Sequence, residues 1–254
     1  MTRTLLGGAP VLLTQAGRGA DPLRSNLGLH VGDDPNVVHR RRRLLSEQLE
    51  TAIVWMDQTH SHTVATVSLT REGPVVVDAC GRRPLEELHE GELGPVDADA
   101  VIVDARLWKG APGAAVMTAD CVPILLTGCD GALIAAVHAG RKGLQEGIIS
   151  RTVSQMSELG ATRIQALIGP SICGKCYEVP AQMRDEVAQT HHGAPATTSW
   201  GTPALDLVTA AADELRELGC RVDIDGRCTR EDPTLHSYRR DCACGRQASV
   251  IAPA

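Results

Sequence analysis

Two apolar segments separated by a glycine-bounded turn constrain the fold more than any other feature of this sequence. Residues 113–126 read GAAVMTADCVPILL, residues 131–140 read GALIAAVHAG, and a Gly-Cys-Asp-Gly stretch lies at 128–131. Apolar runs that flank such a turn are typical of a β-hairpin. Pro123 restricts the first of these strands to a sheet edge or to an irregular start, because proline lacks the amide proton of the ladder.

The hairpin makes Cys121 and His138 candidate metal ligands. If the turn residues are Cys129 and Asp130, Cys121 lies directly opposite His138, with the two Cβ atoms roughly 4.5–5.5 Å apart. If the turn is Asp130-Gly131, they are diagonal neighbours. In both registers the two side chains share one face of the hairpin, because side chains alternate along a strand. Taken singly, each would more often be a buried thiol or a hydrogen-bonded core histidine.

A catalytic zinc site needs a third protein ligand and one open position. The segment QTHSH at 58–62 offers His60 or His62, which lie at alternate positions and would share a face of a strand. Beyond His138 the chain reads AGRKGLQEG, where a glycine-flanked turn opens a helix beside Arg141 and Lys142. Free backbone N–H groups and two cations make this a candidate anion site, although a solvated helix start has the same appearance.

Composition narrows the function classes. The 254 residues carry a net charge of −6, no apolar run reaches the length of a membrane span, and the nine cysteines form no small disulfide framework. We therefore expect a cytoplasmic protein that binds neither nucleic acid nor membranes. There is no Phe, so the core must consist of Val, Leu, Ile and Ala.

Helical and strand-like segments alternate along the whole chain, which predicts one domain over residues 1–254 that mixes helices with β-sheet. The expected helices are 34–49, 143–160, 180–189 and 203–219. The expected strands lie within 51–69, 74–79, 98–104, 113–126, 131–140, 164–170 and 246–251.

Short motifs in a fixed order resemble those of the YfiH family, also described as laccase-domain polyphenol oxidases, peptidoglycan editing factors or purine nucleoside phosphorylases. The resemblance extends over nearly the whole chain. It is carried by SNLGLHVGDDP (25–35), QTHSH (58–62), ADAVIV (98–103), TADCVPILL (118–126), AAVHAGRKGL (135–144), IGPSICGKCYEV (168–179), LDL (205–207), CTRED (228–232) and SYRRD followed by GRQASVI (237–251).

The resemblance implies an α+β fold with four layers, α/β/β/α, built on mixed β-sheets. It also implies a metal centre of His60, Cys121 and His138, most simply with zinc, copper being the alternative. The activity implied is phosphorolysis of adenosine, inosine and methylthioadenosine, with adenosine deamination at the same site. The partners would then be a purine nucleoside and phosphate; the oligomeric state stays open.

Four positions depart from the family pattern. Ser61 replaces a glycine, Arg141 a tryptophan, Lys142 an arginine and Arg41 an asparagine, whereas Arg42 is the expected residue. Lysine keeps the charge of arginine but cannot bind phosphate in a bidentate manner. These departures affect the expected substrate more than the expected metal.

In a phosphorylase, Arg42, Arg141 and Lys142 would bind phosphate. Cys121 and His138 would be catalytic residues as well as metal ligands, together with Asp120. Asp120 is the candidate general acid or base, and its alternative role is to stabilise a turn.

Other activities remain open from the residues alone. Copper-dependent phenol oxidation needs clustered histidines that the chain lacks. Cys121 could instead be a nucleophile with His138 as its base, in an amidase or hydrolase that edits peptidoglycan precursors.

A structural zinc site is also conceivable. Cys173, Cys176, Cys242 and Cys244 could supply four thiolates, or they could be ordinary turn cysteines, and Cys228 could approach the metal centre.

Overall fold

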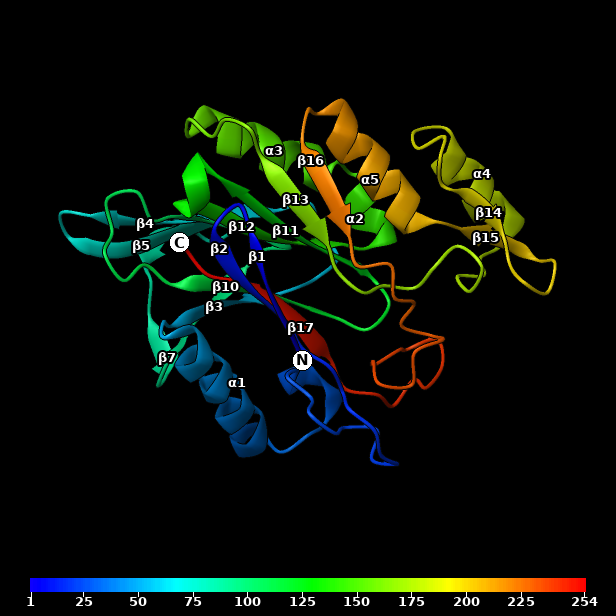
Figure 1. The fold of residues 1–254 in the computed structure, drawn as a ribbon, viewed down its shortest axis with the longest axis horizontal. Helices are drawn as coiled ribbons and strands as arrows, with labels where there is room; N and C mark the ends of the chain where they lie inside the picture. The colour runs from blue at the N-terminus through cyan, green and yellow to red at the C-terminus, as the bar shows by residue number, and fades with distance from the viewer.

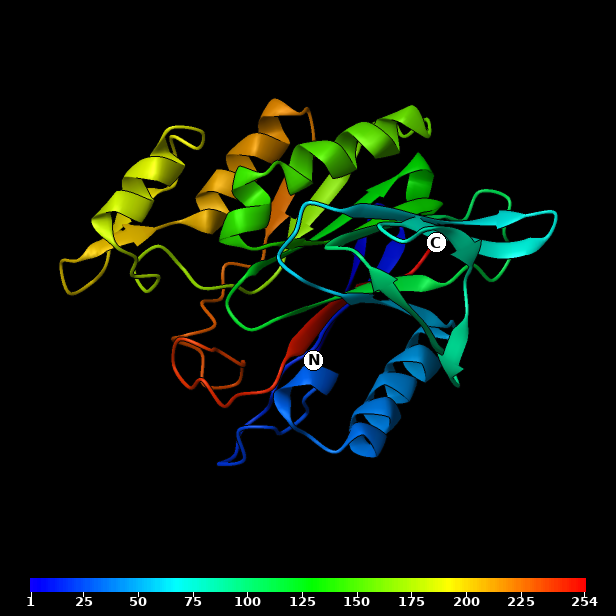
Figure 2. The same cartoon turned by 180° about the vertical axis from the view of Figure 1, so that it is seen from behind.

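Two large mixed β-sheets lie face to face at the centre of the protein, and helices cover both outer surfaces (Figures 1 and 2). The structure is a computed structural model that describes residues 1–254. The seven-stranded sheet has the order β1 (Thr2–Leu6), β2 (Ala9–Leu13), β17 (Gln247–Ile251), β10 (Gly113–Thr118), β3 (Ile53–Asp57), β8 (Glu92–Asp97) and β7 (Glu87–His89).

The eight-stranded sheet has the order β16 (Arg221–Ile224), β13 (Gln165–Ile168), β11 (Val122–Gly128), β12 (Leu133–Ala139), β9 (Ala100–Asp104), β4 (Val64–Thr70), β5 (Gly73–Asp78) and β6 (Gly81–Pro84). A small ribbon pairs β14 (Pro195–Thr197) with β15 (Pro203–Leu205). The helices are α1 (Pro35–Leu49), α2 (Arg141–Gln145), α3 (Ile148–Glu158), α4 (Ala181–Ala188) and α5 (Leu207–Glu217), with short 3-10 turns at Leu29–Val31 and Cys129–Gly131.

Three apolar cores separate the four layers. Along β12, Leu133, Ala135 and Val137 pack against α3 and α5, whereas Ile134 and Ala136 face the seven-stranded sheet. A third core lies between the seven-stranded sheet and α1, which covers its outer face (Figure 1). Strands buried on both faces read as continuous apolar runs, which explains the sequence of β11 and β12. The four-layer arrangement of mixed sheets expected from the family resemblance is confirmed.

The central hairpin adopts the second of the two predicted registers. Gly128 pairs with Leu133 and Pro123 with His138, so Cys121 and His138 are diagonal neighbours on one face. Although β11 lies inside its sheet, its pairing with β13 begins only at Ile124. Pro123 therefore occupies the irregular start of the strand, where its missing N–H removes no ladder hydrogen bond.

The helix expected over 143–160 is divided in two. Gly147 adopts a left-handed conformation with φ of 81° and separates α2 from α3. The helix expected over 34–49 forms as predicted: the Asp34 carboxylate accepts a hydrogen bond from the Asn36 N–H and caps α1. None of the helices is both long enough and apolar enough to traverse a bilayer.

Candidate metal centre and its cleft

The candidate metal centre lies where the chain crosses three times from one large sheet to the other. Strands β8, β3 and β10 are adjacent and parallel, so their carboxyl ends meet at one edge of the seven-stranded sheet. Each continues into the eight-stranded sheet through a short segment, and these segments carry Asp99, His60 and Cys121 respectively. His138 lies near the end of β12 and, by strand parity, faces the same inter-sheet space.

The three predicted ligands come together. The donor atoms of His60, Cys121 and His138 all lie within 4.8 Å of one another. The Cys121 Sγ is 3.7 Å from the His60 Nε2, and the two imidazole rings meet edge to face with centroids 4.7 Å apart. His138 is buried, Cys121 is half-buried and His60 is exposed, so the group opens towards solvent on the His60 side. Zinc accepts such an N, S, N set with one open position, so the residues present fit a metal ion.

Glycine at position 140 permits this close approach. A Cβ atom at Gly140 would lie 2.9 Å from the His60 ring and 3.4 Å from the Cys121 sulfur. Any side chain there would displace a candidate ligand.

Asp99 holds the centre together, and our sequence interpretation gave it no role. Its fully buried carboxylate lies 2.7 Å from the His138 Nδ1. It also accepts hydrogen bonds from the backbone N–H groups of Thr59, His60 and Ser61 and from the Ser61 hydroxyl. A carboxylate that orients a ligating histidine is a common outer-shell partner of metal sites. The polar residue inside the apolar ADAVIV strand motif was the signal available in the sequence.

Charges in the metal-free centre stabilise one another. Burial alone would raise the pKa of Cys121, but the His138 charge and hydrogen bonds from both histidines lower it to about 6. Burial would lower the pKa of His138, yet the Cys121 charge and the Asp99 hydrogen bond raise it to about 9. Burial opposes ionisation of Asp99, but hydrogen bonds from His138 and Ser61 lower its pKa to about 2. At neutral pH the group therefore contains a thiolate beside an imidazolium.

His62, the alternative third ligand, points elsewhere. Its Nδ1 lies 2.7 Å from the Glu146 carboxylate at the end of α2. The segment 58–63 is a loop rather than a strand, so the two histidines do not share a face. His60 therefore joins the centre, and His62 does not.

A cleft with a volume of about 380 Å³ opens beside the centre. Its walls include His60, Cys121 and His138 together with Tyr177, Tyr238, His30, Arg239 and Arg246. The chain has only two tyrosines, and both lie here. The Arg239 guanidinium stacks over the Tyr177 ring at 4.6 Å. The cleft thus combines aromatic surface with positive charge.

Asp120 lines this cleft, but its carboxylate is already bound by the protein itself. One carboxylate oxygen accepts a hydrogen bond from the Thr229 hydroxyl at 2.6 Å, and the other accepts from the Arg239 N–H at 2.7 Å. Its backbone has a positive φ of 102°, an unfavourable value for a residue with a side chain. These contacts match the turn-stabilising role that the sequence left open.

The three cations predicted to bind phosphate do not line the cleft. The buried Arg42 binds Glu92 and the Leu27 carbonyl and stacks on Trp55, so its guanidinium is already used. Arg141 donates to the Gln145 side chain, and the exposed Lys142 lies 3.8 Å from Glu146. Arg239 and Arg246, which the sequence interpretation did not single out, are the arginines in the cleft.

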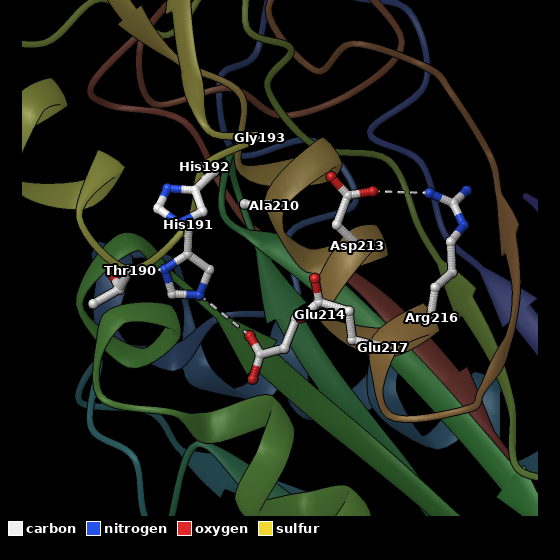
Figure 3. Close-up of a pocket in the computed structure, with 9 residues that line it drawn as sticks. All are labelled: Thr190, His191, His192, Gly193, Ala210, Asp213, Glu214, Arg216 and Glu217. Carbon is white, nitrogen blue, oxygen red and sulfur yellow. Dashed lines mark hydrogen bonds and ion pairs between the residues drawn. The ribbon is translucent and has the colours of Figure 1, made fainter.

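A larger hollow of about 620 Å³ lies between the loop after α4 and the helix α5 (Figure 3). Four of its ionisable side chains form two pairs: His191 contacts Glu214, and Arg216 contacts Asp213. It contains no cysteine and only one apolar residue, and neither of its histidines belongs to a potential metal group.

Fold and site together define a protein of two stacked mixed sheets with a potential three-residue metal centre at their edge. The chain belongs to the family described as multi-copper polyphenol oxidoreductase laccase, whose model matches residues 13–254. It is 42% identical to a purine nucleoside phosphorylase of Streptomyces coelicolor, over 89% of this chain and 86% of the relative. It is 34% identical to the purine nucleoside phosphorylase YfiH of Shigella flexneri, over 89% and 85%. The crystal structure of the hypothetical protein YfiH of Bacillus licheniformis superposes with a TM-score of 0.78 at 25% identity, over 97% and 93%.

Proposed function

We propose that the protein is a metal-dependent purine nucleoside phosphorylase acting on adenosine, inosine or methylthioadenosine. One observation carries the proposal: the His60–Cys121–His138 group opens into a cleft that contains both tyrosines and two arginines. Relatives named purine nucleoside phosphorylases support the same activity. A flat purine fits aromatic walls, and phosphate fits arginine side chains.

Arg246 and Arg239 are the proposed phosphate ligands. The Arg246 Nη1 donates to the carbonyls of Cys244 and Gly245, and this contact fixes the guanidinium in place. Its Nε and Nη2 have no protein acceptor. Arg239 is similarly held, because its Nη1 donates to the Glu178 carbonyl. Both side chains therefore present fixed N–H groups to an anion.

In the reaction, a phosphate oxygen forms a bond to the ribose C1′ while the bond from C1′ to the purine nitrogen breaks. The electron pair of that bond leaves with the purine, which is then protonated, and the products are free base and ribose 1-phosphate. A zinc ion at the centre would supply positive charge that binds and orients an oxygen ligand. Asp120 keeps the Arg239 backbone in place, and Asp99 keeps His138 in one tautomer.

The first test is product analysis with adenosine and phosphate. We expect native protein to release adenine and ribose 1-phosphate, and His138→Ala to lose at least about 100-fold in rate, because the metal is lost. His62→Ala is the matched control: it removes a histidine from the same QTHSH segment whose ring is bound to Glu146 and lies outside the metal centre. Chromatography of the base and an assay of the sugar phosphate measure both products.

The outcomes separate the competing activities. Inosine without free base would replace phosphorolysis by deamination at the same centre. Equal losses in His138→Ala and His62→Ala, or no phosphate-dependent turnover at all, would contradict the proposal.

A second candidate function rests on the ion pair of Cys121 and His138. A thiolate beside an imidazolium is the arrangement of cysteine hydrolases, so Cys121 could attack an amide of a peptidoglycan precursor. We favour the first function, because His60 completes a set of three donors of the kind that binds a catalytic zinc ion. A cysteine nucleophile with His138 as its base would not need this third donor. Copper oxidation has less support: of the nine histidines, only His60 and His138 belong to a potential metal group.

Alkylation by iodoacetamide distinguishes a nucleophile from a ligand. In metal-free protein the Cys121 rate should rise with pH through an inflection near pH 6, because the thiolate fraction grows above its pKa of about 6. The exposed Cys80 and Cys242 provide the internal comparison. Added Zn²⁺ should protect Cys121 and leave those two unchanged. Turnover in chelator that disappears on alkylation of Cys121 would favour the hydrolase instead. Mass spectrometry of peptides gives each rate.

A further inference from the structure

A second group of potential metal ligands lies beside the cleft, outside the centre described above. It consists of Cys173, Cys176, Cys228 and Glu231, whose ligand atoms all lie within 4.8 Å of one another. Cys173 and Cys176 belong to the loop that follows β13, and Cys228 and Glu231 to the loop that follows β16. All three cysteines are free thiols, and Cys176 and Cys228 are buried. Three thiols converging on one point without a disulfide require an explanation.

The backbone fixes the two loops side by side. Strands β13 and β16 are parallel neighbours, and their pairing continues as an isolated parallel bridge between Ser171 and Cys228. The Ser171 N–H donates to the Arg227 carbonyl, and the Thr229 N–H donates to the Ser171 carbonyl. The cluster is therefore formed by sheet geometry and not by chance contact of mobile side chains.

Local turns orient the ligand atoms. The Cys176 N–H donates to the Cys173 carbonyl at 2.9 Å, which closes the Cys-x-x-Cys turn. The Cys173 N–H donates to the Cys228 sulfur at 3.4 Å, and the Cys176 sulfur lies 3.4 Å from a Glu231 oxygen. N–H donation to a cysteine sulfur is the kind of outer-shell contact that stabilises a thiolate ligand.

We propose that Cys173, Cys176, Cys228 and Glu231 form a structural zinc site. A tetrahedral ion with Zn–S bonds of about 2.3 Å separates its sulfur ligands by roughly 3.8 Å, and the cluster needs only a small contraction to reach this. Three thiolates select zinc over magnesium or calcium, which bind through oxygen. The Cys-x-x-Cys spacing is common in structural zinc sites, and Cys228 and Glu231 repeat it as Cys-x-x-Glu.

The ligand set differs from the one considered from the sequence, which joined Cys173 and Cys176 to Cys242 and Cys244. Cys242 is exposed, and the Cys244 sulfur lies 4.0 Å from the Arg246 guanidinium, outside the cluster. Cys228 belongs to the second group and not to the centre at Cys121.

The site lies where it can stabilise the cleft. Tyr177 follows Cys176 directly, and Thr229 follows Cys228. The Ile172 N–H donates to the Asp120 carbonyl, and the Thr229 hydroxyl donates to its carboxylate. An ion that ties the two loops together therefore holds Tyr177 and Asp120 in place. Its role is structural, as in closed four-ligand sites.

Metal analysis of the purified full-length chain, produced with Zn²⁺ in the medium, tests the site. We expect two zinc ions per chain in native protein and in the control Cys242→Ser, and one in Cys176→Ser. The double variant Cys121→Ser/His138→Ala should also retain one. After replacement of that ion by Co²⁺, its absorption should contain the charge-transfer bands of several thiolate ligands. Removing it with chelator should lower the Tm of the double variant by on the order of 10 °C.

The results separate this site from the catalytic centre. If the double variant binds no zinc, or binds cobalt without thiolate bands, the structural site is refuted, whatever the nucleoside activity. One ion in native protein that persists in the double variant would uphold the structural site and count against the catalytic metal. The double variant keeps every cluster residue, so the test stands even if Cys176→Ser does not fold.

Discussion

Asp99→Ala is expected to destabilise the protein by about 3–5 kcal/mol and to weaken metal binding by about 10- to 100-fold. The carboxylate is fully buried, and it accepts hydrogen bonds from the His138 ring and from the backbone N–H groups of His60 and Ser61. Alanine leaves these donors without partners inside the protein, and each lost partner costs about 1–3 kcal/mol. The ring of His138 also loses the contact that fixes its tautomer.

Urea unfolding and zinc titration measure the two effects of Asp99→Ala. Asp99→Asn is the matched variant, because an amide oxygen can still accept a hydrogen bond while the charge is removed. We expect Asn to restore much of the stability and less of the metal affinity, since a neutral amide polarises His138 less than a carboxylate does. Full metal affinity in Asp99→Ala would contradict the assignment of Asp99 as the residue that orients His138.

The pairing of Cys121 with His138 was predictable because it depends on strand parity alone. Side chains alternate with a period of two, so either register of the hairpin places both on one face. The four layers were expected only from the family resemblance, whereas the apolar runs by themselves indicated buried strands without fixing how the sheets stack. The register of the hairpin was not predictable, since a Gly-Cys-Asp-Gly turn permits two loop positions and only packing selects one.

The roles of the charged residues could not be predicted from the sequence. Arg42 and Arg246 carry the same charge in family-like motifs, but Arg42 is buried against Glu92 and Arg246 lines the cleft. That difference depends on contacts with residues far away in the chain. The same holds for Asp99, which meets His138 only because three chain crossings converge at one sheet edge. Glu231 likewise joins the cysteine cluster through the parallel pairing of β13 with β16.

Arg246→Ala is expected to lower kcat/KM for phosphate by about 10- to 100-fold and to leave the KM for the nucleoside nearly unchanged. Hydrogen bonds to charged groups contribute about 1.5–3 kcal/mol, and each 1.4 kcal/mol corresponds to a factor of ten. The contacts of Nη1 with two carbonyls hold the guanidinium before phosphate arrives, so little ordering is required on binding. Steady-state rates at varied phosphate and saturating nucleoside measure the effect.

Two further variants identify where the phosphate binds. Arg246→Lys keeps the charge and most of the aliphatic stem that packs near Gly28, yet it cannot form a bidentate contact and should recover only part of the loss. Lys142→Ala removes the exposed cation at the start of α2 that the sequence favoured, and it should change kcat/KM for phosphate by no more than about twofold. The reverse pattern, a large loss in Lys142→Ala and none in Arg246→Ala, would contradict this assignment and indicate that phosphate binds at the start of α2. The nucleoside would then approach the metal centre from the side of α2, and the cleft lined by the tyrosines would need another ligand.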